Sequence, residues 1–237
     1  MNLARMFQCL ANAVDSLCEW YWTTPLISRD FSRFFPEITS YSSKGQEFQF
    51  VYKARLHQHD WCLTFLARIT VNGAEGDSIV VKFVDRYGIE PHELLTSEEL
   101  APRLMYFSDL AKRRPGHWYD GFGMVVMEHL EGTTLADKYA RSVVSDDVRA
   151  AVTKAIGILA GKYLVRGDLR RSNVMVLNGD GKEQVRIIDF DWSGRAEVVR
   201  YPLFLSSSVF PAELGIRDFE LIEKSHDVVM AERMFIR

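Results

Sequence analysis

The chain has 237 residues, 47% of them hydrophobic, and a formal net charge of -3. This length and composition allow a substantial hydrophobic core, in one large domain or two small lobes, and argue against disorder. Because both signs of charge are spread along the sequence, nothing attracts the whole protein to nucleic acid or to an anionic membrane surface, and we predict neither partner.

Cys9, Cys18 and Cys62 are odd in number and lack CxxC spacing, which predicts free thiols in a reducing compartment. The N-terminal stretch has no continuous apolar core of the signal-peptide type, and no run of eighteen apolar residues occurs. We therefore expect a cytoplasmic protein without a membrane span.

The first 45 residues are predicted to form an extension to which no chemistry is assigned. Apolar residues recur there at helical spacing, which predicts an amphipathic helix containing Leu3, Met6, Phe7, Leu10, Val14 and Leu17. An aromatic stretch with a proline, residues 31–43, follows this helix.

Residues 46–127 are predicted to form a small lobe built from an antiparallel sheet and one helix. Three β-rich runs cover residues 47–56, 61–71 and 78–85, and polar turns separate them, the second turn spanning residues 72–77. A helix is expected to start near Pro91 and to stop before Pro102, and residues 123–130 predict a further buried strand.

Residues 128–237 are predicted to be mainly helical. Ser145 is a suitable N-cap, and Asp146 and Asp147 suit the first turn of a helix. The apolar face of that helix comprises Val148, Ala151, Val152, Ala155, Ile156, Leu159 and Tyr163. A short polar loop follows, and after it a strand, a glycine-containing turn and a second strand lead to "IDFDWSG".

The polar loop, "YLVRGDLRRSNVMVL" over residues 163–177, carries chemically useful side chains between two apolar runs. Asn173, together with Asp189 beyond the next strands, supplies the hard oxygen ligands that Mg²⁺ prefers. Asp168 is then left as a base that orients a hydroxyl nucleophile, and the charge of Arg170 offsets that of a transferring phosphoryl group. An ordinary polar turn, in which Arg170 and Arg171 are only solvated, is the alternative.

Lys82 is a single cation within the apolar run "IVVKFV", and a buried ammonium needs an anionic partner. The helix that follows offers Glu90 and Glu93, of which we favour Glu90. A lysine paired with a helical glutamate can hold an ATP phosphate at the same time.

Together these residues resemble the protein kinase-like superfamily, including small-molecule kinases and fungal kinase-like proteins. The resemblance spans about residues 47 to 230 and rests on "VVKF" with Lys82, on Glu90, on "RGDLRRSN" and on "IDFD" with Asp189. It implies an α+β two-lobed kinase-like fold with a shortened C-terminal lobe. It also implies a hinge at "MEHL", where Met127 is the gatekeeper and the backbone of Glu128 and Leu130 binds adenine.

Three departures from the family pattern bear on function. The first hairpin has the turn "LHQHD" in place of a glycine-rich loop, Arg166 stands where the catalytic-loop histidine is usual, and Asp191 replaces the glycine of D-F-G. "FPAEL" is a faint match to A-P-E, and Asp227 is a candidate anchor for the catalytic loop.

The resemblance implies a phosphotransferase that uses ATP and Mg²⁺ and acts on a hydroxyl of a small molecule or a protein. The alternative is a pseudokinase, a non-catalytic module for nucleotide binding or protein interaction. Intact Lys82, Asp168, Asn173 and Asp189 favour the enzyme, whereas the missing glycine-rich loop favours the pseudokinase.

Overall fold

The computed structural model describes residues 3–23, 35–56, 63–109, 122–178, 182–206 and 215–236. The chain divides into two units, residues 1–37 and residues 38–237. The first unit contains helix α1 (Leu3–Thr23), which confirms the predicted amphipathic helix, and its apolar side chains are exposed. In the part of the chain that the structure describes, no helix combines the length and the hydropathy needed to span a membrane.

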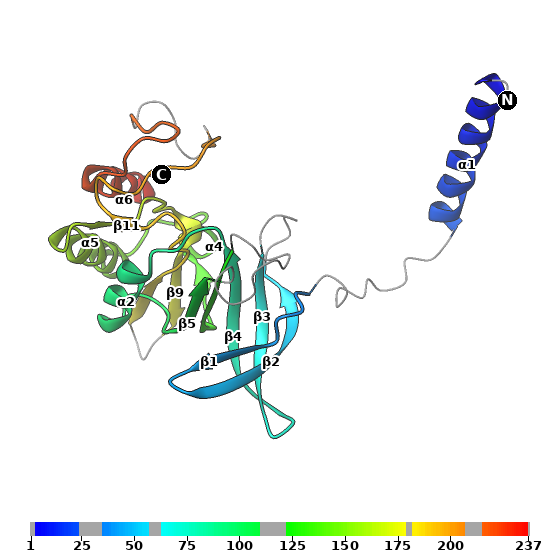
Figure 1. The fold of residues 1–237 in the computed structure, drawn as a ribbon. Coiled ribbons are helices and arrows are strands. Elements are labelled where there is room, and N and C mark those ends of the chain that lie inside the picture. Colours follow the sequence, from blue (N-terminus) through cyan, green and yellow to red (C-terminus); the bar gives the residue numbers. More distant parts are fainter. Residues whose placement is uncertain are drawn as a thin grey trace. The chain divides into compact units, whose positions relative to one another are not determined.

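The second unit begins with a six-stranded antiparallel sheet (Figure 1). In spatial order its strands are β1 (Ser40–Ser43), β2 (Gln46–Arg55), β3 (Thr64–Val71), β4 (Ala74–Val84), β6 (Gly123–Glu128) and β5 (Leu104–Asp109). The predicted meander is thus present.

Three details of the sheet differ from the sequence prediction. Strand β1 lies in the segment predicted as part of the extension, and β5 had no predicted counterpart. The turn predicted over residues 72–77 is shorter, because Asn72 and Gly73 both adopt positive φ (51° and 80°) and β4 already starts at Ala74. Two residues of positive φ suit a tight hairpin turn.

Successive side chains along each strand point to opposite faces of the sheet, and this alternation determines the face on which each residue lies. Phe50 and Tyr52 of β2 pack edge to face at 5.3 Å between ring centroids, and Tyr52 packs in the same way on Phe65 of β3. In β4, Val81 and Phe83 belong to this aromatic face, so Lys82 between them points to the opposite face. That face also carries the buried residues Val84, Val125 and Met127.

Helix α2 (Ile89–Ser97) connects β4 to β5 and starts two residues before Pro91. The remaining elements are β7 (Thr133–Thr134), α4 (Leu135–Lys138), α5 (Asp146–Gly161), β8 (Leu164–Val165), the 3-10 turn η2 (Arg171–Asn173), β9 (Val174–Asn178), β10 (Glu183–Ile187), β11 (Gly194–Arg195) and α6 (Lys224–Phe235). β9 and β10 form the predicted hairpin, and β7 pairs with β9.

Helix α5 follows its prediction at the start but not at the end. The Ser145 hydroxyl accepts a hydrogen bond from the Val148 N–H at 3.4 Å, as an N-cap does. Tyr163, expected on the buried face, is 69% exposed. The helix ends at Gly161, and Tyr163 takes a positive φ of 56°, which turns its side chain away from the helical face.

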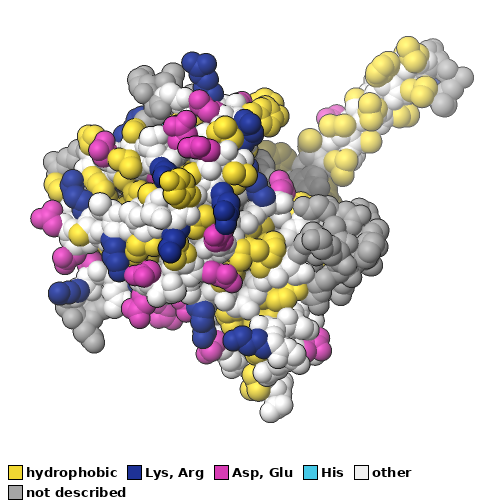
Figure 2. Space-filling model, turned by 60° about the vertical axis from the view of Figure 1, so that its left-hand side comes forward, with side chains coloured by type: hydrophobic (Ala, Val, Ile, Leu, Met, Phe, Trp, Pro, Cys, Tyr) yellow, Lys and Arg dark blue, Asp and Glu magenta, His cyan; other side chains and the backbone are white. Residues whose placement is uncertain are grey.

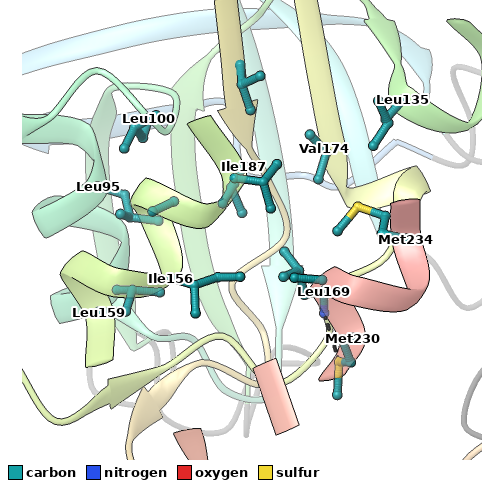
Figure 3. Close-up of a cluster of buried hydrophobic side chains, with 14 of the residues drawn as sticks. Leu95, Leu100, Leu135, Ile156, Leu159, Leu169, Val174, Ile187, Met230 and Met234 are labelled. Carbon is teal, nitrogen blue, oxygen red and sulfur yellow. Dashed lines mark hydrogen bonds between the residues drawn. The ribbon is translucent and has the colours of Figure 1, made fainter. Parts of the chain in front are cut away.

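The largest described core lies where α2, α5, α6 and the β9–β10 hairpin meet (Figure 3). Leu95 of α2, Ile156 and Leu159 of α5, and Ile187 of β10 are buried together there. A dashed line in the figure marks the bond from the Leu169 N–H to the Met230 Sδ, at 3.3 Å. The polar loop is thus packed between elements that are far apart in sequence.

Charged side chains of both signs intermingle on the face of the second unit that Figure 2 shows. This mixture fits the near balance of 29 basic and 32 acidic residues in the sequence.

Candidate functional site

Lys82 and Asp189, which were predicted to act on the same ATP–Mg²⁺ complex, contact each other directly. Strand β4 turns Lys82 away from the aromatic face of the sheet. The Lys82 Nζ forms ion pairs with Asp189 and, at 2.6 Å, with the Oδ1 of Asp191. Lys82 as a whole is 8% exposed, so the two carboxylates neutralise an ammonium that is largely removed from water.

Asp168 lies on the polar loop with one carboxylate oxygen held and the other without a partner. Its Oδ2 accepts a hydrogen bond from the Asn173 Nδ2 at 2.9 Å and lies 3.1 Å from the Arg170 Nη2. Its Oδ1 is buried and has no hydrogen-bond partner among the residues that the structure describes. Because buried polar atoms are rarely left unpaired, this oxygen is available to a group that the protein itself does not supply.

Asn173 connects the polar loop to Asp189. Its Nδ2 also donates to the backbone carbonyl of Asp168 at 3.0 Å. The backbone carbonyl of Asn173 accepts from the Ile188 N–H at 3.0 Å. Asp189 comes directly after Ile188 and has a positive φ of 69°, which aspartate tolerates better than most residues. Asn173 thus bonds Asp168 directly and is linked to Asp189 through the neighbouring Ile188.

Asp227 anchors the polar loop from helix α6, as the sequence predicts. Its two carboxylate oxygens accept from the backbone N–H groups of Arg166 and Gly167 at 2.6 and 2.8 Å. Gly167 has a positive φ of 77°, and a Cβ there would lie 2.8 Å from the Ile222 side chain. Only glycine therefore fits this turn without displacing its neighbours.

Arg166, near the start of the polar loop, is a fully buried cation. Its guanidinium donates to the Ile188 carbonyl and stacks 5.1 Å from the ring centre of Phe190. On the α2 side, the ring of His92 stacks on Phe190 at 4.5 Å with an interplanar angle of 7°. Phe190, which lies between Asp189 and Asp191, is thus packed against both Arg166 and His92.

The predicted ion pair between Lys82 and Glu90 is not formed, and this expectation is corrected. Glu90 lies 3.5 Å from Arg195 instead, and Glu93 is exposed. His92 is the α2 residue that packs against Phe190, and a helix turns by about 200° over two residues. Glu90 is therefore on the opposite side of α2 from Phe190.

The predicted hinge residues lie at the end of β6. Met127 is buried and pairs in register with Val80 of β4. The Glu128 N–H donates to the Arg103 carbonyl at 3.0 Å, and the Glu128 side chain accepts from the Arg103 N–H. The Glu128 N–H is therefore already used within the protein, and the Glu128 carbonyl is the backbone group of this residue left for adenine.

The two loop arginines differ in environment. Arg170 lies against Asp168 with a partly exposed side chain, so it remains a candidate for charge stabilisation. Arg171 donates to the carbonyls of Met234 and Tyr139, so it links parts of the structure and is not merely solvated. The turn "LHQHD" beyond Leu56 and the "FPAEL" match lie outside the described residues.

Electrostatics in the site follow from burial opposed by the neighbouring charges. Burial disfavours the charged form of Asp189, but Lys82 and Arg166 outweigh it and hold the pKa of Asp189 below its usual range. Burial and the adjacent Asp189 both raise the pKa of Asp191. Burial also raises the pKa of Asp168, and Arg166 and Arg170 partly offset that effect.

Sequence reasoning noted Arg166 and Asp191 as departures from the family pattern but gave neither a role. For Asp191 the signal was its place two residues after Asp189, the residue predicted to bind Mg²⁺. For Arg166 the sequence contains no comparable signal, since its partners, Ile188 and Phe190, come from a later segment.

Within the described residues, no three His, Cys, Asp or Glu side chains gather as a metal-binding cluster.

Comparison with solved structures supports the fold. The chain is similar in structure to the kinase PK-1 of Cydia pomonella granulovirus, with a TM-score of 0.53 and 15% sequence identity. The match covers 78% of this chain and 68% of the viral chain. No family model and no curated protein matches the sequence. At this identity the likeness establishes a kinase-like fold.

Proposed function

We propose that the protein is a phosphotransferase that uses ATP and Mg²⁺ to phosphorylate a hydroxyl group. The observation that carries this proposal is the buried Oδ1 of Asp168. Within the described part of the chain it has no partner, although the Oδ2 of the same carboxylate contacts both Asn173 and Arg170. A carboxylate presented in this way suits the orientation of an acceptor hydroxyl.

The side chains around Asp168 fit a metal–nucleotide complex. Asn173 bonds Asp168 through its Nδ2, so its amide oxygen is directed away from that carboxylate. This oxygen and the ionised Asp189 are hard donors of the kind that hold Mg²⁺ together with phosphate oxygens and water. When bound, Mg²⁺ supplies positive charge against the triphosphate.

The other residues position the substrates. Lys82 presents an ammonium to the phosphates, and Arg170 stabilises charge on the transferring group. Met127, the Glu128 carbonyl and the Leu130 N–H receive the adenine, since the Glu128 N–H is engaged by Arg103. The acceptor hydroxyl gives up its proton towards Asp168 as the new bond to phosphorus forms and the bond to ADP breaks.

The experiment measures ATP binding and turnover separately. Thermal shift with ATP, with and without Mg²⁺, reports binding, because a ligand of the folded form raises stability. γ-labelled ATP with a panel of hydroxyl acceptors reports transfer. We expect Asp168→Asn to lose transfer but keep the shift, and Asp189→Asn to lose the metal-dependent part of the shift. Asp77→Asn, a change at an exposed strand residue, is the control.

A pseudokinase is the second candidate, and one specific observation favours it. Lys82 is already neutralised by two carboxylates, so the resting site holds no surplus positive charge at this lysine. A thermal shift with ATP but no transfer to any acceptor would support the pseudokinase. The absence of any shift would contradict ATP binding and leave a protein-interaction module.

A further inference from the structure

Lys82 has two carboxylate partners, and both come from the same short segment. Asp189 and Asp191 flank Phe190 and reach the Lys82 Nζ from one side. The side chain of Lys82 is 11% exposed, whereas those of Asp189 and Asp191 are 30% and 31% exposed. A lysine this buried needs an anion beside it in every state that the protein adopts.

The helix glutamate does not provide that anion. Glu90 is 57% exposed in its side chain and lies against Arg195. Helix α2 is also held in its present rotation, because His92 is buried against Phe190 with its Nε2 2.7 Å from the Pro102 carbonyl. Bringing Glu90 to Lys82 would require His92 to leave this packed position.

The segment of Asp191 is fixed from both sides. The Gly88 N–H donates to the Phe190 carbonyl at 2.9 Å, and a Cβ at Gly88 would lie 2.6 Å from the Ser193 Cβ. Arg166 bonds the Ile188 carbonyl on the other side. The Asp191 carboxylate therefore reaches Lys82 from a rigid support, as a positioning group requires.

We propose that Asp191 is the positioning residue for Lys82, in the place that the helix glutamate has in the kinase pattern. The inference rests on the proposed function, in which Asp189 is a metal ligand. Asp189 then shares its charge with the ion, and Asp191 remains as the carboxylate that orients Lys82 towards the phosphates. Asp191 thus acts through Lys82 and does not itself touch the nucleotide.

Isothermal titration of the full chain with Mg-ATP tests this assignment. Asp191→Asn is expected to raise the Kd by about ten-fold or more, because it removes one partner of a buried charge pair. Asp191→Glu, which keeps the charge, should recover part of the loss. Glu90→Gln should weaken binding less than Asp191→Asn, and Asp85→Asn controls for the loss of one negative charge on the neighbouring exposed chain.

A double-mutant cycle separates positioning from a merely structural role. If Asp191 acts through the ammonium, Asp191→Asn should change the Kd by less than about two-fold when Lys82 is already methionine. A structural role predicts the same ten-fold loss in both backgrounds, together with a lowered melting temperature. That result would overturn the proposal.

Three other outcomes would overturn it too. If Glu90→Gln is the more damaging variant, the helix glutamate is the partner of Lys82 in the loaded protein. If Asp191→Asn binds Mg-ATP as tightly as the unmodified chain or more tightly, Asp191 does not position the lysine, although the proposed function stands. If the unmodified chain binds no Mg-ATP, the proposed function and this inference fail together.

Discussion

At the scale of single residues, the site depends on buried charged side chains that form hydrogen bonds to the backbone of the site. Asp227, which is 2% exposed, accepts two backbone N–H groups of the polar loop, and Arg166, which is fully buried, bonds the carbonyl before Asp189. Neither side chain needs to contact a substrate to matter. Each determines where Asp168 or Asp189 lies.

Asp227→Ala should destabilise the protein by about 2–4 kcal/mol, because two buried N–H groups lose their acceptors. Asp227→Asn keeps one acceptor oxygen and should lose about half as much. Urea unfolding of the three proteins measures the difference. Equal midpoints for Asp227→Ala and the unmodified chain would contradict the anchoring role.

His92 predicts a pH dependence of stability. Burial, reinforced by nearby Arg166 and partly opposed by the bond to the Pro102 carbonyl, lowers the pKa of His92 to about 4 from an unfolded value of 6.5. The unfolded chain therefore takes up a proton as the pH falls through 6.5, whereas the folded protein resists until about pH 4. Stability from this group is present above pH 6.5 and is lost between these values.

The loss between pH 7 and pH 5 should be about 2 kcal/mol, as a shift of this size gives. Chemical unfolding at both pH values measures it, with His92→Gln as the variant that lacks the titrating ring. If the variant shows the same slope with pH as the unmodified chain, His92 is not the group responsible.

At the scale of elements, the capping of α5 could be predicted from the sequence, whereas the rotation of α2 could not. Ser145 caps α5 at the predicted residue, and its hydroxyl also donates to the Glu183 Oε2 at 2.5 Å. The rotation of α2, in contrast, is set by the stacking of His92 on Phe190. A cap depends on neighbours in sequence, but a helix rotation depends on what the helix packs against.

Ser145→Ala should cost about 1–2 kcal/mol of unfolding free energy, since it removes the N-cap acceptor and one donor to Glu183. Ser145→Thr retains the hydroxyl and should recover most of the loss. Thermal unfolding followed by circular dichroism compares the two. A loss as large in the threonine variant would show that the hydroxyl is not the stabilising group.

At the scale of the whole molecule, residues 38–237 contain the six-stranded sheet, helices α2 to α6 and every residue proposed for the site. The boundary at residue 37 differs from the predicted extension of 45 residues, because β1 pairs with β2. Tyr41 of β1 is 1% exposed and packs on Phe48 and Tyr106. The strand therefore contributes to the core of the second unit.

Removal of residues 1–37 should shift the melting temperature of the second unit by less than about 3 °C, the change that about 1 kcal/mol produces in a domain of this size. Removal of residues 1–45 also deletes Tyr41 and should lower it by clearly more. Differential scanning calorimetry of the two truncated chains gives the comparison. Equal melting temperatures would place the boundary at the predicted position.

Much of the fold was predictable because it follows from local patterns. The β2–β3–β4 meander, the start of α5 and the β9–β10 hairpin each follow from apolar periodicity, turn residues or a cap within one stretch of chain. The order of the motifs predicted that Lys82 and Asp189 serve one site, but the predicted partner of Lys82 was Glu90. Strand β5 was missed because it follows Pro102 and Arg103 without a turn or periodicity signal of its own.

The sequence by itself determined which side chains can act: a lone lysine in an apolar strand, a carboxylate and a carboxamide on one loop, and an aspartate after a buried strand. Only the tertiary structure decided which of them are partners. Lys82 meets Asp191 and not Glu90, because packing of His92 against Phe190 sets the face that α2 turns inward. The sequence of this nine-residue helix does not settle that choice, since either of its glutamates suits an exposed or a paired position equally well.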